Sequence, residues 1–494
     1  MSSKQPQSIL LISCYELGHQ PAGITMPMAF LKRAGYHVEA MDVSVEGFDL
    51  SKVIRAKFVG ISVPMHTALR LGVKVAEAIR KANPDCVICF YGLYASLNSE
   101  YLLGTVADYC IGGEFEESLV ELAASTASGA PQISTASCSD RVPQISTTTD
   151  TDGPRISTAS GSDRAQPRVA ARSRRVLERL SFPVPDRSAL PPLDTYARLE
   201  RNGEERLAGY VEASRGCLHV CAHCPIPPVY EGRFFIVPQQ VVLEDIRRLV
   251  AAGAEHITFG DPDFLNGPGH SLRILRAMHE EFPALTFDFT AKVEHILKHR
   301  SLFPELAALG CAFIVSAVES LSDDVLMHLE KGHTRRDVYA ALDITRDSGI
   351  PLRPTWVAFT PWTTIADYLD MLEFVQQQEL IDHVDPVQYT IRLLVPPGSA
   401  LLTHPDTGTW LGPLVQESFT YSWSHPDPRM DELQSRAAEL VEQAALDKED
   451  PADTFWTILD LAYEAAGKSH PATAGLRLPP LRRRPPRLTE AWFC

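Results

Sequence analysis

Three cysteines lie close together in the segment SRGCLHVCAHC, residues 214–224. Cys217, Cys221 and Cys224 are separated by three and then two residues, and no fourth cysteine is near them. Thiolates bind iron and zinc, and an open coordination position lets a metal site do chemistry as well as hold structure. Three thiols without a fourth are typical of a [4Fe–4S] cluster with one open iron. A zinc site completed by His219 or His223 is the alternative that the spacing leaves open.

A series of alternating strand-like and helical segments surrounds these cysteines between residues 206 and 400. The strand-like segments are YVEAS, HITFGD, LTFDFTA, CAFIVSAVES, PLRPTWVAFT and DPVQYTIRLLV. Six β–α units are too few to close an eight-stranded barrel, so the pattern predicts an open, partial (βα)6 barrel. The cysteines follow the first strand directly, which places them at the rim where such barrels carry their chemistry.

The motif Cys217-x-x-x-Cys221-x-x-Cys224, placed after the first strand of this series, resembles that of the radical SAM family. The resemblance covers about residues 205 to 400. It implies an enzyme whose cluster binds S-adenosylmethionine (SAM) and cleaves it reductively to methionine and a 5′-deoxyadenosyl radical. It also implies an external electron donor such as flavodoxin or ferredoxin.

The same resemblance implies a set of SAM-binding residues at the rim. His223 would meet the adenine through its backbone, and Gly260 and Asp261 in TFGDPDF would receive the methionine end. Glu319 and Ser320 would bind the ribose, in a segment that resembles the "ES" element of the cobalamin-linked branch of the family. Further candidates are Lys292 with Glu294 and, for a carboxylate, Arg392. A plain Gly-Asp turn, a helix cap at Ser320 and a surface ion pair at Arg392 are the structural alternatives.

Residues 1–125 contain five strand-like segments that alternate with helices, which predicts a doubly wound, Rossmann-like parallel sheet. Ligands bind such sheets at the carboxyl ends of the strands. A domain of this kind ahead of a radical SAM barrel resembles a cobalamin-binding domain, and ADYCIGGEFEESLVELAAS resembles its closing strand, turn and helix. The first loop has His19 but no Asp-x-His-x-x-Gly, so we expect no histidine on cobalt. A domain that has lost its ligand is the alternative. The residues implied to contact the cobalamin are Ser62, Gly92, Gly112, Gly113 and Glu114.

The remaining segments differ in composition. Residues 126–175 contain three polar repeats and predict a disordered linker, followed by a connecting segment at 176–205. Residues 401–476 are helical in pattern, and 477–494 form a Pro/Arg-rich tail that we expect to be an extended, mobile arm. The ending LTEAWFC resembles radical SAM proteins with a CUAEP or CCAEP tail, where U is selenocysteine. That resemblance implies a truncated selenoprotein in which Cys494 is a redox residue.

Composition limits the class of protein. The net charge of −16 makes nucleic acid an unfavourable partner, and no segment is apolar for long enough to predict a membrane span or a signal peptide. We therefore expect a cytoplasmic enzyme acting on a small molecule or peptide that the sequence does not identify. Two alternatives stay open: a tRNA-type methylthiotransferase, and a non-catalytic corrinoid- or zinc-binding redox sensor.

Overall fold

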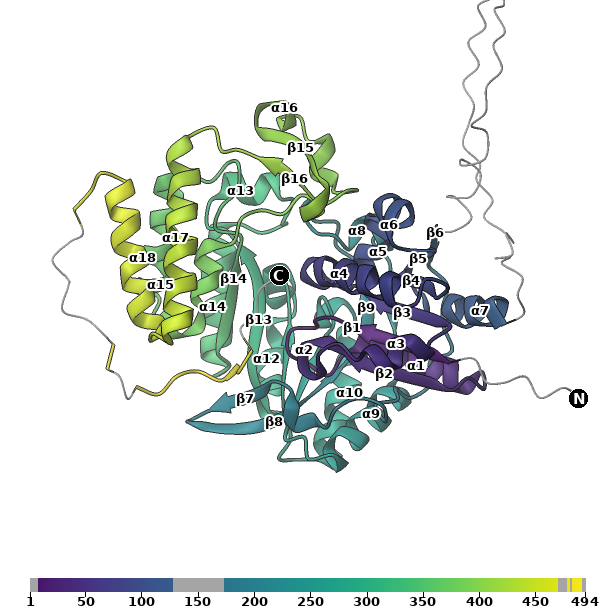
Figure 1. Ribbon diagram of the computed structural model, residues 1–494. Coiled ribbons are helices and arrows are strands. Elements are labelled where there is room, and N and C mark those ends of the chain that lie inside the picture. The colour runs from purple at the N-terminus through teal and green to yellow at the C-terminus, as the bar shows by residue number, and fades with distance from the viewer. Residues whose placement is uncertain (1–7, 128–172, 470–477, 480–481, 491–494) are drawn as a thin grey trace, which may run out of the picture.

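The computed structural model describes residues 8–127, 173–469, 478–479 and 482–490 (Figure 1). Its N-terminal part is a parallel six-stranded sheet in the order β2-β1-β3-β4-β5-β6. Every residue of β1 and β3 is buried, because helices cover both faces of the sheet. The strands are β1 (Ile9–Ser13), β2 (Val38–Asp42), β3 (Phe58–Ser62), β4 (Val87–Tyr91), β5 (Tyr109–Gly113) and β6 (Ser173–Val176).

Two helical layers enclose this sheet. α1 (Ala22–Arg33) and α7 (Glu116–Ala127) share one apolar cluster with one face of the sheet. α3 (Leu50–Arg55), α4 (His66–Ala82) and α6 (Ser99–Thr105) contribute to the cluster on the other face. The strand order runs in opposite directions from β1 to β2 and from β1 to β3, so the switch point between β1 and β3 is where a ligand is expected. The predicted doubly wound sheet is confirmed.

The second sheet has seven strands in the order β14-β13-β12-β11-β8-β7-β17. Five of them are parallel neighbours and form the curled half-barrel that the sequence predicts. These five are β8 (Glu204–Val211), β11 (His256–Phe259), β12 (Thr286–Thr290), β13 (Cys311–Glu319) and β14 (Leu352–Trp356). The helices between and after them are α9 (Gln239–Ala251), α10 (Pro268–Glu281), α11 (Val293–Lys298), α12 (Phe303–Ala308), α13 (Asp323–His328), α14 (Arg335–Asp347) and α15 (Ile365–Gln377).

The predicted sixth barrel strand does not form. Residues 386–390 fold into a 3-10 helix that starts at Pro386, which lacks the N–H that a ladder needs. Among the described residues, an isolated bridge between Phe359 and Arg392 continues the sheet on that side. On the opposite edge, β7 (Arg198–Arg201) pairs antiparallel with β8, within the segment predicted as a connection.

The end of the predicted linker was placed too late, and the predicted helical C-terminal region is confirmed but also contains a hairpin. β6 begins at Ser173, inside the predicted linker, and closes the N-terminal sheet beside β5; its sequence SRRV has no strand-like pattern. The region after 401 contains the hairpin of β15 (Leu411–Val415) and β16 (Thr420–Trp423) as well as its helices, α17 (Pro428–Asp447) and α18 (Pro451–Ala465). These two helices pack together and α18 packs on α15, on the side of the barrel away from the N-terminal sheet (Figure 1).

The described part of the tail is docked, which corrects the expectation of a mobile arm. Arg482 forms ion pairs with Asp382 and Asp450, and β17 (Arg487–Leu488) adds to the sheet at β7. Cys494 and the polar repeats of the linker lie outside the described residues. Among the residues that the structure describes, no helix is both long and apolar enough to cross a membrane.

Candidate functional site

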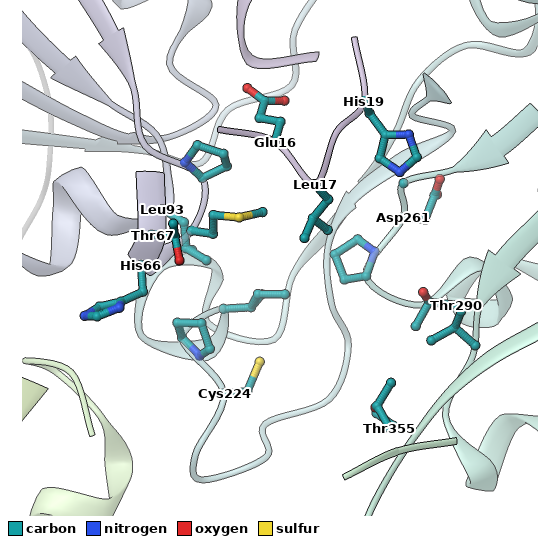
Figure 2. Close-up of a pocket in the computed structure, with 18 of the residues that line it drawn as sticks. Glu16, Leu17, His19, His66, Thr67, Leu93, Cys224, Asp261, Thr290 and Thr355 are labelled. Carbon is teal, nitrogen blue, oxygen red and sulfur yellow. The ribbon is translucent and has the colours of Figure 1, made fainter. Parts of the chain in front are cut away.

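A cavity of about 550 Å³ lies between the N-terminal sheet and the half-barrel. The N-terminal part contributes the loop after β1, including Glu16 and His19, and the loop after β3. The half-barrel contributes the carboxyl ends of its strands and the cysteine loop. Figure 2 shows Cys224 and Asp261 of the barrel facing the same space as Glu16 and His19. Each sheet therefore presents its ligand-binding edge to one shared cavity.

The cysteine loop is fixed at both ends by backbone pairing. β9 (Ser214–Gly216) pairs with β10 (Phe234–Ile236), and the amide of Ala222 donates to the carbonyl of Leu329 at 3.0 Å. Cys217 and Cys221 are buried beside the cavity, and Cys224 lines it. Burial raises the pKa of the Cys224 thiol to about 12, so a bound cation is needed to hold it as a thiolate at neutral pH.

The cysteine loop does not present its thiols and imidazoles as one compact set of ligands of the size that a single zinc ion needs. Tetrahedral zinc holds its sulfur ligands about 3.8 Å apart, given Zn–S bonds of about 2.3 Å. Within the described residues, the three cysteines do not form a group whose ligand atoms all lie within 4.8 Å of one another. The two histidines of the loop also point elsewhere: His219 lies against His295, and His223 against Glu319.

Glu319 is held at the cavity by two partners. Its Oε1 accepts a hydrogen bond of 3.2 Å from Nζ of Lys331 and lies 3.4 Å from Nε2 of His223. Burial alone would raise the pKa of Glu319, but the charge of Lys331 and the contact with His223 lower it to about 2. Glu319 has a φ of +67°, which is rare for a residue with a side chain and common at functional sites. The carboxylate is thus ionised at the cavity wall.

Lys331 is a site residue that the sequence analysis missed. It lies in the segment EKGHT, and its side chain is only 3% exposed. Its pKa is raised: burial opposes the charge, and Glu319 and the thiols of Cys221 and Cys224 favour it. A lysine twelve residues after Glu319 in a chain of mixed polarity carries no signal that distinguishes it from a surface lysine.

Gly260 and Asp261 both line the cavity. A Cβ at Gly260 would lie 1.9 Å from the hydroxyl of Tyr210, so the aromatic ring of β8 already requires a glycine here. Asp261 accepts hydrogen bonds from the amide of Ala213 and the hydroxyl of Ser214, and burial raises its pKa to about 7. These bonds attach the loop after β11 to the strand that leads into the cysteines.

The other two SAM candidates lie away from the cavity wall. Ser320 is buried, and its hydroxyl accepts from the amide of Ser322, which is itself the N-cap residue of α13. Lys292 is buried with its Nζ 3.5 Å from Glu294. Arg392 lines the cavity but is paired with Asp431 at 2.7 Å and stacked on Trp423.

The structure divides the cobalamin candidates into two groups. Ser62 and Gly92 line the cavity, and the Ser62 hydroxyl donates to Glu16. Gly112 and Gly113 do not line it. A Cβ at Gly113 would lie 2.0 Å from the carbonyl of Val176, which makes this glycine a requirement of the pairing with β6. Glu114 is fully buried.

Glu114 belongs to a charged network that joins the two parts of the protein, and the sequence analysis missed this network. The Glu114 carboxylate accepts from the hydroxyl of Tyr230 at 3.1 Å and lies 3.7 Å from Arg215. Arg215 also donates to Glu116 and to Glu212. Three carboxylates from both sides of the interface thus surround one buried guanidinium, two residues before Cys217.

The fold and the cavity together define a ligand-binding parallel sheet that faces an open βα barrel with a three-cysteine rim. Residues 211–375 match the family described as the radical SAM superfamily, and residues 9–123 match the B12 binding domain. The chain therefore contains a radical SAM domain preceded by a B12-binding domain, as the sequence analysis expected. These domains imply a [4Fe–4S] cluster, SAM and cobalamin.

Solved structures share this arrangement. The cobalamin-dependent SAM radical enzyme OxsB, with aqua-cobalamin bound, aligns with a TM-score of 0.66 at 14% identity, over 93% of this chain and 71% of that one. The radical SAM methyltransferase TsrM from Kitasatospora setae aligns with a TM-score of 0.60 at 16% identity, over 95% of this chain and 92% of that one. At these identities the likeness establishes the fold.

Curated relatives match over a shorter stretch. A putative methylthiotransferase of Methanocaldococcus jannaschii is 22% identical over 187 residues, which is 35% of this chain and 40% of that protein. The ribosomal protein uS12 methylthiotransferase RimO of Bacteroides fragilis is 25% identical over 187 residues, or 34% of this chain and 41% of that protein. The chain thus spans about two fifths of the length of these relatives, and the likeness is distant.

Proposed function

We propose that this protein is a cobalamin-linked radical SAM enzyme that transfers a methyl group to, or abstracts hydrogen from, an unactivated carbon. The observation that carries the proposal is the shared cavity. The cysteine rim of the half-barrel and the switch point of the B12-type sheet open into the same space, so two cofactors and a substrate can meet there.

The cluster and SAM supply a 5′-deoxyadenosyl radical, and cobalamin supplies a methyl carrier. Cys217, Cys221 and Cys224 hold the cluster in this proposal. Glu319, ionised by Lys331, binds a hydroxyl pair of the nucleoside. Asp261 keeps the loop after β11 against the cysteine strand through Ala213 and Ser214.

Replacement of the three cysteines tests the cluster. The triple variant Cys217→Ala, Cys221→Ala, Cys224→Ala is expected to lose iron and SAM cleavage after anaerobic reconstitution. Cys311→Ala is the matched control, because Cys311 is a free cysteine on β13, outside the loop. Normal iron content in the triple variant would exclude the cluster. Iron absent from the wild type, with zinc in its place, would favour the redox-sensor alternative.

The cobalt is proposed to carry no protein histidine. His19 stacks on Tyr210 at 4.6 Å between ring centroids, and burial lowers its pKa to about 4. The stacking holds the ring against the barrel. We expect His19→Ala to bind cobalamin and to give the same cob(II)alamin EPR spectrum as the wild type. Loss of nitrogen hyperfine splitting in the variant would show that His19 is the ligand.

The proposal has three finer parts, which concern the subgroup of the family, the electron donor and the location in the cell. Membership of the group with a CUAEP or CCAEP tail is supported by the ending LTEAWFC, and the nucleotide sequence after the Cys494 codon tests it. The electron donor is proposed to be a flavodoxin or ferredoxin. A cytoplasmic location is supported by the free cysteines among the described residues, since reducing compartments keep thiols free.

A further inference from the structure

A second group of metal-binding side chains lies behind the cysteine loop. It consists of His219, Asp263 and His295, whose ligand atoms all lie within 4.8 Å of one another. Asp263 Oδ2 is 2.8 Å from Nδ1 of His295 and 3.9 Å from Nε2 of His219, and the Nε2 atoms of the two histidines are 3.3 Å apart. Neither the cluster nor the SAM site uses Asp263 or His295.

The three residues come from three successive loops at the barrel rim. His219 lies between Cys217 and Cys221 in the cysteine loop, Asp263 follows β11, and His295 is on α11, after β12. Loops that follow neighbouring parallel strands meet at one edge of the sheet. This brings the three side chains together, although His219 and His295 are 76 residues apart in sequence. A cation bound by all three would fasten the cysteine loop to the next two units of the barrel.

The facing groups of Asp263 and His295 are buried together. Asp263 is fully buried and His295 is 5% exposed. Oδ1 of Asp263 accepts from the amide of Leu265 at 3.0 Å, and Oδ2 accepts from the amide of Lys292 at 3.4 Å and faces the histidines. Nδ1 of His295 lies 2.8 Å from Oδ2, without the geometry of a hydrogen bond. Two buried polar atoms this close must share either a proton or a cation, because each is costly to bury alone.

The donor set and spacing fit a first-row divalent cation. Two imidazole nitrogens and one carboxylate oxygen at about 2.0–2.2 Å from zinc lie about 3.3 Å from one another in a tetrahedral site. With Nδ1 of His295 as its ligand atom, Oδ2 of Asp263 lies 2.8 Å from that nitrogen and 3.9 Å from Nε2 of His219, on either side of this value. Three protein ligands leave one position open to water, and His219 is the ligand nearest to solvent, with 17% of its side chain exposed.

The carboxylate of Glu294 orients the ring of His219. Oε2 of Glu294 lies 3.6 Å from Nδ1 of His219, so Nε2 of the same ring is turned towards Asp263 and His295. Metal-binding histidines commonly have such a carboxylate on their second nitrogen. The ammonium of Lys292 lies 3.5 Å from the same Glu294, which offsets its positive charge near the site.

We propose that His219, Asp263 and His295 bind a divalent zinc-type cation that anchors the cysteine loop to the barrel, separately from the iron–sulfur cluster. The full-length protein is reconstituted with iron and sulfide, incubated with zinc and desalted, and both metals are measured by mass spectrometry. About one zinc per chain is expected beyond the cluster iron. Asp263→Asn and His295→Asn are expected to lose this zinc at least tenfold while iron is retained.

His404→Asn is the matched control, because His328, His404 and Asp406 form the other described group of this kind. This variant is expected to keep the zinc. Zinc absent from the wild type, or present equally in Asp263→Asn and His295→Asn, would overturn the proposal, as would its loss in His404→Asn alone.

Cobalt(II) gives a second, spectroscopic readout that reports which atoms bind the cation. In the chain with Cys217→Ala, Cys221→Ala and Cys224→Ala, the proposal expects bound Co²⁺ to retain the visible bands of a nitrogen and oxygen site. It expects these bands to vanish when His219→Asn is added. Bands that disappear in the cysteine variant would place the cation on the thiolates and refute the proposal.

Discussion

Nη1 of Arg215 lies 2.5 Å from Oε1 of Glu116, which joins the strand before the cysteine loop to the first turn of α7. Both side chains are buried, and Glu116 is fully so. The strength of this contact depends on its surroundings, because Glu114 and Glu212 contribute two further carboxylates to the same guanidinium. The guanidinium of Arg215 therefore keeps three carboxylates together at the junction of the B12-type sheet and the barrel.

Replacement of Arg215 by an uncharged residue is expected to lower the free energy of unfolding strongly. Arg215→Met leaves buried carboxylates unpaired, and breaking a buried ion pair in this way costs about 3–5 kcal/mol. Chemical denaturation of the full chain measures the loss. Arg174→Ala is the control, because its pair with Glu121 is exposed and worth at most about 1 kcal/mol. A loss for Arg215→Met no greater than for the control would mean that the two parts are held together by other contacts.

Glu16 gives the protein a pH dependence between about pH 4.5 and pH 8. Burial at the cavity wall raises the pKa of Glu16 from 4.5 to about 8, although Gly23 and Ser62 donate hydrogen bonds to it. The pKa of Glu16 is higher in the folded state than in the unfolded state, so protonation of Glu16 stabilises the fold. This contribution to the free energy of unfolding is complete below pH 4.5, where Glu16 is protonated in both states, and it is lost as the pH rises through about 8.

Glu16→Gln imitates the protonated carboxyl and removes this dependence. The variant is expected to gain stability over the wild type as the pH rises across that range, by about 1–3 kcal/mol because water reaches the cavity. Urea denaturation of both proteins at several pH values measures the difference. Parallel curves for the two proteins would show that Glu16 titrates normally.

The sequence predicted the parts of the site that depend on short, regular patterns. The three cysteines are near in sequence, so their common position after β8 and β9 follows from the strand before them. The two parallel sheets follow from alternating strands and helices, whereas the strand order and the shared cavity came only from the structure. The sixth barrel strand was predicted from an apolar run, but Pro386 starts a 3-10 helix there. Short edge strands such as β6 and β17 depend on a partner strand far away in sequence, so no local pattern predicts them.

Residues that act through long-range contacts were not predictable. Arg215 and Glu116 are 99 residues apart, and neither is unusual in its own segment. Gly260 was predicted to allow a ligand to approach closely, and the structure adds a second reason, because a side chain at 260 would clash with the ring of Tyr210. Asp263 and His295 stand in segments that read as an ordinary turn and an ordinary helix, and only the fold brings them to His219.

Lys331 is expected to set the affinity for SAM through Glu319. Lys331→Met removes the charge that keeps the Glu319 carboxylate ionised, so its hydrogen bonds to a ribose weaken. Hydrogen bonds to charged groups contribute about 1.5–3 kcal/mol, which corresponds to roughly 10- to 150-fold in the dissociation constant. Calorimetric titration of SAM into the reconstituted protein measures the change. Lys298→Met, which alters an exposed lysine of α11, is the control; equal affinity in both variants would remove Glu319 from the SAM site.

The described tail closes one side of the cavity and is held by two arginines. Arg482 donates to both Asp382 and Asp450, and Arg484 donates to Asp450 at 2.7 Å. Hydrogen bonds from Arg482 are the main reason why the pKa of Asp450 is lowered to about 2. Beyond them, β17 pairs with β7, and Leu488 and Glu490 line the cavity, where Glu490 accepts from the hydroxyl of Tyr15 at 3.0 Å.

The double variant Arg482→Ala, Arg484→Ala is expected to release this segment without unfolding the barrel. The two-residue pairing of β17 is too short to hold the strand alone, so loss of the ion pairs should speed amide exchange in residues 482–490 by about 10- to 100-fold. Hydrogen-exchange mass spectrometry of the full chain measures this, with α17 as an internal reference that should not change. Arg483→Ala is the matched control, because this exposed arginine contacts only the Asn202 side chain among the described bonds. Unchanged exchange in the double variant would mean that β17 and Glu490, not the arginines, fix the tail across the cavity.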